Sequence, residues 1–241
     1  MEEAKNWKNK VILVTGAAGG LGKAISTLLL ETGSTVILTD IHEEKAIETA
    51  AKLKGNAMAL EMDVADENRV KEVMRHIRHE YGRLDVLINN AGIDVTKSIM
   101  HMEVSEWDCI TNVNLRGPFL TAKYALPIMA EQQSGHIVNV ISTASLRAWT
   151  EASAYHATKW GLRGFTQALF TEARRDNIKV TAVIAGGMKT DFLFSRFPDI
   201  DRSKLQDPLN VARTIKFVLE QPEESVVPEV MVLPLQETSW P

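Results

Sequence analysis

Short runs of apolar and β-branched residues recur along the chain, separated by longer segments in which apolar residues return every three or four positions. The short runs contain few polar residues, which is typical of parallel strands whose two faces are both covered by helices. The alternation predicts an α/β fold with a doubly wound, seven-stranded parallel sheet and helices on both of its faces. The predicted strands are KVILVT (10–15), STVILTD (34–40), NAMALEM (56–62), RLDVLIN (83–89), GHIVNVIS (135–142), IKVTAVI (178–184) and EVMVLP (229–234).

Two of the intervening segments carry clear helix boundaries. GGLGKAISTLLLETG begins and ends at glycines, and ADENRVKEVMRHIRHEYG opens with acidic and closes with basic residues before Gly82, the charge order that a helix dipole favours. The longest helical patterns run from Ser105 to Gln132 and from Ala154 to Asp176. Pro118 and Pro127 predict that the first of these is broken or kinked.

Length and charge narrow the functional classes. The 241 residues suit one domain spanning 1–241. With 27 basic and 31 acidic residues, the chain lacks the excess of positive charge that is typical of nucleic-acid-binding proteins. No stretch approaches the apolar length of a membrane span, and the N-terminal MEEAKNWKNK lacks an apolar signal region, so we expect a cytoplasmic protein with no membrane partner. The single cysteine, Cys109, excludes an internal disulfide and is expected to be a small buried hydrophobe.

A glycine cluster follows the first predicted strand. In VILVTGAAGGLG, the glycines at 16, 20 and 22 carry the pattern T-G-x-x-x-G-x-G immediately before a helix. Glycine permits a tight turn and lets the backbone approach a pyrophosphate, whose charge then meets the unpaired N–H groups of the helix. The alternative is a turn that only packs the helix on the strand, but the position after the first strand of a βα series favours dinucleotide binding.

An acidic residue ends the second predicted strand. Asp40 lies 24 residues beyond Gly16, close to the spacing at which a carboxylate accepts the adenosine ribose hydroxyls of NAD. It would repel the 2′-phosphate of NADP, so we predict NAD as the cofactor and NADP as less favoured. The alternative is that Asp40 only caps the following helix. Asp63 and Val64 after the third strand, and NNAG (89–92) after the fourth, belong to the same carboxyl edge.

The segment SAYHATKWG (153–161) places Tyr155 and Lys159 four residues apart in a helical pattern, so both side chains lie on one face. A free phenol has a pKa near 10, about three units above working pH. The lysine charge, joined by that of an oxidised nicotinamide, is expected to move the tyrosine towards a pH where it can serve as both acid and base.

Together these motifs resemble the short-chain dehydrogenase/reductase family of Rossmann-fold oxidoreductases over nearly the whole chain. The resemblance rests on TGAAGGLG, NNAG, Asn114 in NVNLRGPF, Ser142 in GHIVNVIS, and Tyr155 with Lys159. It implies that these four residues form a catalytic tetrad, with Ser142 donating to the substrate oxygen and Asn114 helping a water chain to refill the proton through Lys159. The implied cofactor contacts are Gly16, Ala18, Gly19, Gly20, Leu21, Asp40, Ile41, Asp63, Val64, Asn90, Ala91, Gly92, Tyr155, Lys159, Gly186, Met188 and Thr190.

The chain departs from the family pattern near its C-terminus. Thr181 and Ala185 stand where V-N-x-x-x-P-G-x-x-x-T usually has Asn and Pro, while Gly186 and Thr190 remain. Without the proline, we expect a freer backbone before the loop that holds the nicotinamide end. VPEVMVLPLQETSWP replaces the frequent Gly-Gly ending, which suggests a different substrate or assembly.

The 18 residues from Asp191 to Pro208 contain three phenylalanines and no clear period, and we expect a substrate loop at about 190–208. Several apolar residues fall where the family lines its substrate cleft, although each suits an ordinary core equally well. These are Ile93, Trp149, Met188, Phe192, Phe194 and Phe197.

The resulting hypothesis is an NAD(H)-dependent oxidoreductase that interconverts a secondary alcohol and a ketone. One alternative is an NADPH-dependent 3-oxoacyl reductase, against which Asp40 argues. Another is a nucleotide-sensing protein without turnover, which would not need Ser142, Tyr155 and Lys159 together. His76 and His79 share a helix face without a third ligand, so no metal is expected. Related proteins pair their two long helices across subunits, which implies a homotetramer.

Overall fold

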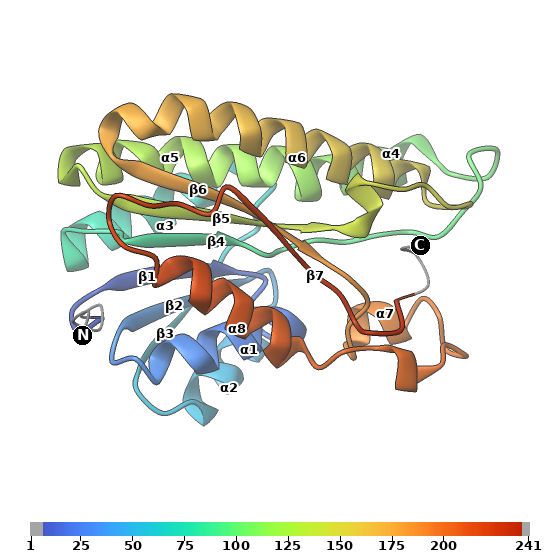
Figure 1. The fold of residues 1–241 in the computed structure, drawn as a ribbon, viewed down its shortest axis with the longest axis horizontal. Coiled ribbons are helices and arrows are strands. Elements are labelled where there is room, and N and C mark those ends of the chain that lie inside the picture. Colours follow the sequence, from blue (N-terminus) through green and yellow to red (C-terminus); the bar gives the residue numbers. More distant parts are fainter. Residues whose placement is uncertain (1–6, 238–241) are drawn as a thin grey trace.

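The computed structural model describes residues 7–237, so the predicted features at 1–6 and 238–241 lie outside the described residues. Seven strands form one parallel sheet in the order β3-β2-β1-β4-β5-β6-β7 (Figure 1). The predicted α/β fold and its doubly wound sheet are therefore confirmed. The strands are β1 (Val11–Thr15), β2 (Thr35–Asp40), β3 (Asn56–Glu61), β4 (Val86–Asn89), β5 (Gly135–Ser142), β6 (Ile178–Ala185) and β7 (Glu229–Val232).

Helices cover the two faces of the sheet in separate layers (Figure 1). Successive strand side chains point to opposite faces: Leu13 packs in the core on one face, whereas Ile12 and Val14 pack in a separate core on the other. Both faces are therefore buried, which explains the nearly continuous apolar strands. One layer holds α1 (Gly20–Leu30), α2 (Glu43–Lys52) and α8 (Pro208–Leu219), and the other holds α3 (Glu67–Tyr81), α4 (Val104–Thr111), α5 (Gly117–Gln132) and α6 (Ser153–Ala173).

The local signals explain where the helices begin and end. Asp66 accepts hydrogen bonds from the N–H groups of the first turn of α3, and Gly82 ends that helix with a φ of 65°. Helix α8 was not predicted from the sequence, although its start carries ordinary signals: Asp207 accepts from the Leu209 N–H at 2.8 Å, and Pro208 occupies the first turn.

The predicted break between Ser105 and Gln132 is a π-helical turn at Asn112–Arg116, which joins α4 to α5. At its end the Gly117 N–H donates to the Asn112 carbonyl, five residues earlier, whereas an α-helical hydrogen bond spans four residues. Pro118 follows in the first turn of α5, where its missing N–H is tolerated, while Pro127 lies inside α5 without ending it.

The expected substrate loop carries short ordered elements. It contains α7 (Asp191–Phe194) and a 3₁₀ turn at Arg202–Lys204. A parallel bridge between Met188 and Gln206 closes its base, with the Lys189 N–H donating to the Gln206 carbonyl at 2.9 Å. The loop therefore projects from the carboxyl edge of the sheet as a unit with fixed ends. Within residues 7–237, no helix is long and apolar enough to cross a membrane.

At the opposite edge of the sheet, Asp85 joins the start of β4 to β1. Its carboxylate accepts the Val11 N–H at 2.9 Å, Lys10 Nζ at 2.8 Å and two nitrogens of Arg83 at 2.6 and 2.7 Å. Burial of Asp85 opposes ionisation, but the hydrogen bonds from Arg83, Lys10 and Val11 outweigh it and hold its pKa below the usual 3.8.

Replacing Asp85 by Ala should lower the free energy of unfolding by about 2 to 4 kcal/mol, because it leaves a backbone donor and two cations without their acceptor. Because the folded-state pKa is depressed, this stabilisation is complete above about pH 3.8 and is lost as the pH falls through the folded-state value. Urea denaturation of both proteins at a series of pH values measures the difference. A difference that persists undiminished at the lowest pH would contradict the assignment.

Candidate active site

A cavity of about 1690 Å³ opens at the carboxyl edge of the sheet, between the strand ends and the substrate loop. Every residue predicted to contact the cofactor lines this cavity, as does Ser142. The parallel topology produces this convergence, because all seven strands end at the same edge. The structure therefore brings the predicted residues together, and their individual roles remain predictions.

The glycine loop after β1 is shaped by close contacts. Gly16 has a φ of 63°, and a Cβ atom there would lie 2.8 Å from Ala91 Cα. A Cβ atom on Gly22 would lie 2.2 Å from the Gly16 carbonyl oxygen, so α1 packs against its own loop only with glycine there. Gly19 occupies the N-cap of α1 and offers no side chain to its first N–H groups. This cradle fits the pyrophosphate of a dinucleotide.

Asn90 and Thr15 join the glycine loop to the end of β4. Thr15 Oγ1 accepts the N–H groups of Asn90 and Ala91, each at 3.0 Å, while Asn90 Nδ2 donates to the carbonyls of Thr15 at 2.9 Å and Gly16 at 3.0 Å. The pattern analysis did not single out Thr15. Its hydroxyl and the Asn90 amide fix the backbone that forms this side of the cavity.

Asp40 holds the glycine loop from the end of β2. Its Oδ2 accepts the Ala18 N–H and its Oδ1 accepts the His42 N–H, both at 3.1 Å. The N-cap residue of α2 is His42, so Asp40 is not the helix cap that the sequence left open. His42 and Lys45, which the sequence analysis did not include, line the cavity next to Asp40.

The proposed proton-transfer residues lie together at the end of β5 and on the first turns of α6. Ser142 ends β5, and its hydroxyl lies close enough to that of Tyr155 to lower the pKa of the phenol. Lys159 lies one turn further along α6, with Nζ 5.6 Å from the centre of the Tyr155 ring, and donates to the Val140 carbonyl at 3.1 Å. Both side chains are buried, at 7% exposure for Tyr155 and 5% for Lys159.

Burial controls the protonation of this pair. It raises the pKa of Tyr155 to about 12, against the lowering effects of the Ser142 hydrogen bond and the Arg196 charge. It also lowers the pKa of Lys159 to about 8. Loss of hydration opposes the charged forms of both residues in this structure. The expected shift of the tyrosine towards neutral pH, which also relies on the charge of the oxidised nicotinamide, stays a prediction.

Asn114 lies behind the cavity wall and is fully buried within the π-helical turn. Its amide donates to the Ile93 carbonyl and accepts the Ile93 N–H, both at 2.8 Å, and also donates to Thr158 Oγ1 at 3.3 Å. It therefore ties the loop after β4 to α6, next to Lys159. The water relay implied by the family resemblance remains a prediction.

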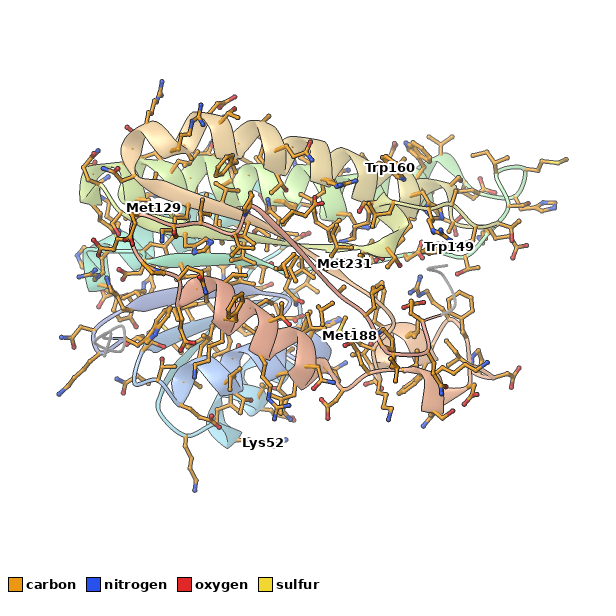
Figure 2. All side chains as sticks on the ribbon, in the orientation of Figure 1. Lys52, Met129, Trp149, Trp160, Met188 and Met231 are labelled. Atoms are coloured by element: carbon orange, nitrogen blue, oxygen red, sulfur yellow. The ribbon has the colours of Figure 1, made fainter. Side chains whose placement is uncertain are left out.

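The wall beneath the substrate loop is apolar. Five of the six predicted apolar residues line it, and Met188 lies beside α7 with Trp149 towards the same end of the molecule (Figure 2). Phe194 does not line it and instead stacks with Arg202, whose Cζ lies 4.1 Å from the ring centre. Cys109 corrects another expectation, because it is exposed at the edge of the cavity rather than buried.

The C-terminal departures have structural counterparts. Ala185 is paired in β6 with Ser142 and Val232, so the backbone there is held by the sheet rather than freed by the missing proline. Glu237 in the replacement tail accepts the Gly187 N–H at 2.9 Å and lines the cavity. Thr181 Oγ1 donates to the Val227 carbonyl at 2.8 Å and anchors the segment before β7.

Sequence relatives match this chain over nearly their whole length. A family model described as short chain dehydrogenase matches residues 10–201. An uncharacterized oxidoreductase of Staphylococcus aureus is 35% identical over 228 residues, covering 94% of this chain and 98% of that protein. A 3-oxoacyl-(acyl-carrier-protein) reductase of Thermotoga maritima is 34% identical over 236 residues, covering 93% of this chain and 96% of that protein.

Solved structures agree with these relatives. A metagenomic short-chain oxidoreductase in complex with NADP has a TM-score of 0.85 and 28% identity, covering 95% of this chain and 99% of that one. Levodione reductase has a TM-score of 0.88 and 26% identity, and the match covers 95% of this chain and 98% of that one. The family match, the parallel sheet and the cavity lined by the glycine loop lead to one conclusion: the chain belongs to the short-chain dehydrogenase family and is an oxidoreductase.

Proposed function

We propose that this oxidoreductase interconverts a secondary alcohol and a ketone, with NAD(H) preferred over NADP(H). The observation that carries the proposal is the hydroxyl pair of Ser142 and Tyr155, which lines the cavity with Lys159 one helical turn away. The glycine loop, the N-terminus of α1 and Asp40 would hold the dinucleotide. The nicotinamide supplies the hydride in reduction and accepts it in oxidation.

The protein's part in ketone reduction is to deliver a proton to the carbonyl oxygen. With a pKa of about 12, Tyr155 is protonated at neutral pH and ready to donate. Ser142 would hold the substrate oxygen next to the phenol and stabilise the charge that develops on it. In the oxidation direction Tyr155 must accept the proton, and the Ser142 hydrogen bond and the Arg196 charge both favour its phenolate.

Lys159 is suited to exchange that proton with its surroundings. Its pKa of about 8 lies close to working pH, so both of its protonation states are accessible. Its Nζ is fixed by the Val140 carbonyl, and Asn114 bonds to Thr158, the residue before it. A proton relay from Tyr155 through Lys159 towards Asn114 therefore forms part of the proposal.

An NADPH-dependent 3-oxoacyl reductase is the second candidate. The Thermotoga maritima relative has that activity in its name, and a structural neighbour was crystallised with NADP. His42 and Lys45 could also offset part of the charge of Asp40. Membership of an oxidoreductase family argues against the non-catalytic sensor.

Replacing Tyr155 by Phe should lower turnover by on the order of 100-fold or more, because it removes the proton donor. Cofactor affinity and thermal stability should change little. Tyr81→Phe is the matched control, since that hydroxyl contacts Met58 Sδ at 3.5 Å and does not line the cavity. Steady-state rates with a panel of ketones and alcohols measure the effect. Near-normal turnover in the Tyr155 variant would contradict the assignment of Tyr155 as the proton donor.

Asp40 should set the cofactor preference. Two unit charges about 4 Å apart repel by roughly 4 kcal/mol at an effective dielectric of 20, and solvent reduces this to about 2 to 3 kcal/mol. We expect a preference for NAD of about 30- to 150-fold, measured as the ratio of kcat/KM values. Asp40→Asn should shrink it, mainly by improving the use of NADP.

Asp63→Asn is the matched control for cofactor choice. Asp63 also lines the cavity, and its Oδ1 accepts the Ala65 N–H at 2.8 Å. Its substitution should weaken both cofactors alike and leave their ratio unchanged. The proposal would be contradicted if the wild-type protein preferred NADP, or if Asp40→Asn left the ratio of kcat/KM values for the two cofactors unchanged. Asp40 would then only hold the glycine loop in place.

We also propose a homotetramer, assembled through the long helices α5 and α6. Phe119 on α5 is 44% exposed and Trp160 on α6, labelled in Figure 2, is 51% exposed, so both helices present apolar surface that a second subunit could cover. Light scattering at micromolar concentration should give four times the chain mass, and Trp160→Glu should give smaller species. A monomer mass for the wild-type protein would refute the proposal.

A further inference from the structure

A charged pair joins the substrate loop to the sheet edge beside the proposed proton donor. Arg196 follows α7, and its Nη1 donates to Asp94 Oδ2 in the loop after β4. The Asp94 side chain is buried, with 2% of it exposed, and the Arg196 side chain is partly buried, with 14% exposed. The pair could not be predicted from sequence patterns, because its members lie 102 residues apart.

Other contacts fix the orientation of the Arg196 guanidinium. Its Nε donates to the Phe192 carbonyl at 3.0 Å, and its Cζ lies 4.1 Å from the centre of the Phe192 ring and 5.4 Å from that of Phe197. The remaining nitrogen, Nη2, has no acceptor among residues 7–237 and is not among their buried unpartnered atoms. It is therefore a donor held in a fixed direction and open to a ligand.

This open donor lies close to the reaction centre. Arg196 Cζ is 5.8 Å from the centre of the Tyr155 ring, and both residues line the cavity. The wall around them is largely apolar, with Ile93, Leu193 and Ile200 among its residues. A substrate placed with its reacting oxygen at Tyr155 would thus meet an N–H donor in largely apolar surroundings.

We propose that Arg196 is a specificity-determining residue that binds a second, neutral carbonyl oxygen of the substrate, and that Asp94 is the residue that positions it. The preferred substrates are then apolar or aromatic ketones with another carbonyl group next to the reacting carbon. This inference rests on the proposed ketone reductase function and adds a substrate class to it.

The charges explain why the second oxygen is neutral. Asp94 already balances the Arg196 charge, so the pair offers a hydrogen-bond donor without a net positive charge. Asp94 Oδ1 is buried and has no hydrogen-bond partner among the described residues. A substrate carboxylate would therefore approach a second negative charge, which the charges of Arg196 and Lys159 already offset in the protein itself.

Three aromatic ketones that differ only beside the reacting carbonyl test the inference. Propiophenone carries an alkyl group there, acetylbenzoyl a second carbonyl and benzoylformate a carboxylate. Arg196→Met should lower kcat/KM for acetylbenzoyl by roughly 10- to 100-fold more than for propiophenone, because only the former loses a charge-assisted hydrogen bond. Each ketone is compared with itself across the variants, so differences in intrinsic reactivity cancel.

Arg202→Met is the matched control. Arg202 stacks on Phe194 at 4.1 Å in the same loop but does not line the cavity, so its loss should affect all three ketones equally. Asp94→Asn should reproduce part of the selective loss. Combined with Arg196→Met, it should add no further selectivity, because Asp94 acts through Arg196. The double variant also avoids leaving a buried carboxylate unpaired.

If the Arg196 variants lose the same factor in kcat/KM for propiophenone and acetylbenzoyl, the inference is overturned. Arg196 would then only hold the substrate loop in place. A wild-type preference for benzoylformate that disappears with Arg196 would also overturn the inference, since that indicates recognition of charge. Calorimetric binding of each ketone to the protein with oxidised cofactor separates the two proposals. If acetylbenzoyl binds selectively but is not turned over, the ketone reductase function is rejected and the role of Arg196 in binding stands. If the ketones are turned over without selective binding, only the role of Arg196 is rejected.

Discussion

Parallel pairing is the constraint on which the rest of this structure depends. Each strand must be followed by a crossover before the next can pair in the same direction, and helices provide those crossovers on both faces. All carboxyl ends therefore meet at one edge, where the backbone leaves the sheet and its polar groups need new partners. Thr15, Asp40 and Asn90 satisfy some of these groups, and the first N–H groups of α1 face the cavity without a side-chain cap.

The same edge creates conflicting requirements for charge. Tyr155 and Lys159 are held in place by burial, and burial disfavours the charged forms of both. The nearby Asp94 and Arg196 act on Tyr155 in opposite directions, since Arg196 lowers its pKa and Asp94 raises it. The acid–base properties of the centre therefore depend on the substrate loop as well as on α6, although the two are distant in sequence.

Features encoded by local spacing were predictable from the sequence. Tyr155 and Lys159 share a helix face, and the glycine loop lies between a strand and a helix, because neighbouring residues determine both. Tertiary contacts were not predictable in this way. The Asp94–Arg196 pair spans 102 residues, Asn114 depends on a widened helical turn, and the exposure of Cys109 reflects how α4 lies against the cavity.

The bridge between Met188 and Gln206 has a consequence for how such a protein can change. It fixes the two ends of the intervening segment on the sheet edge, so the residues between them can be lengthened or replaced without moving Tyr155 or the glycine loop. Doubling the length of a flexible loop costs only about 0.6 kcal/mol in closure entropy. Substrate recognition can therefore change through this segment while the strand ends and the glycine loop keep their places, and a replacement of Arg196 within it would also alter the pKa of Tyr155.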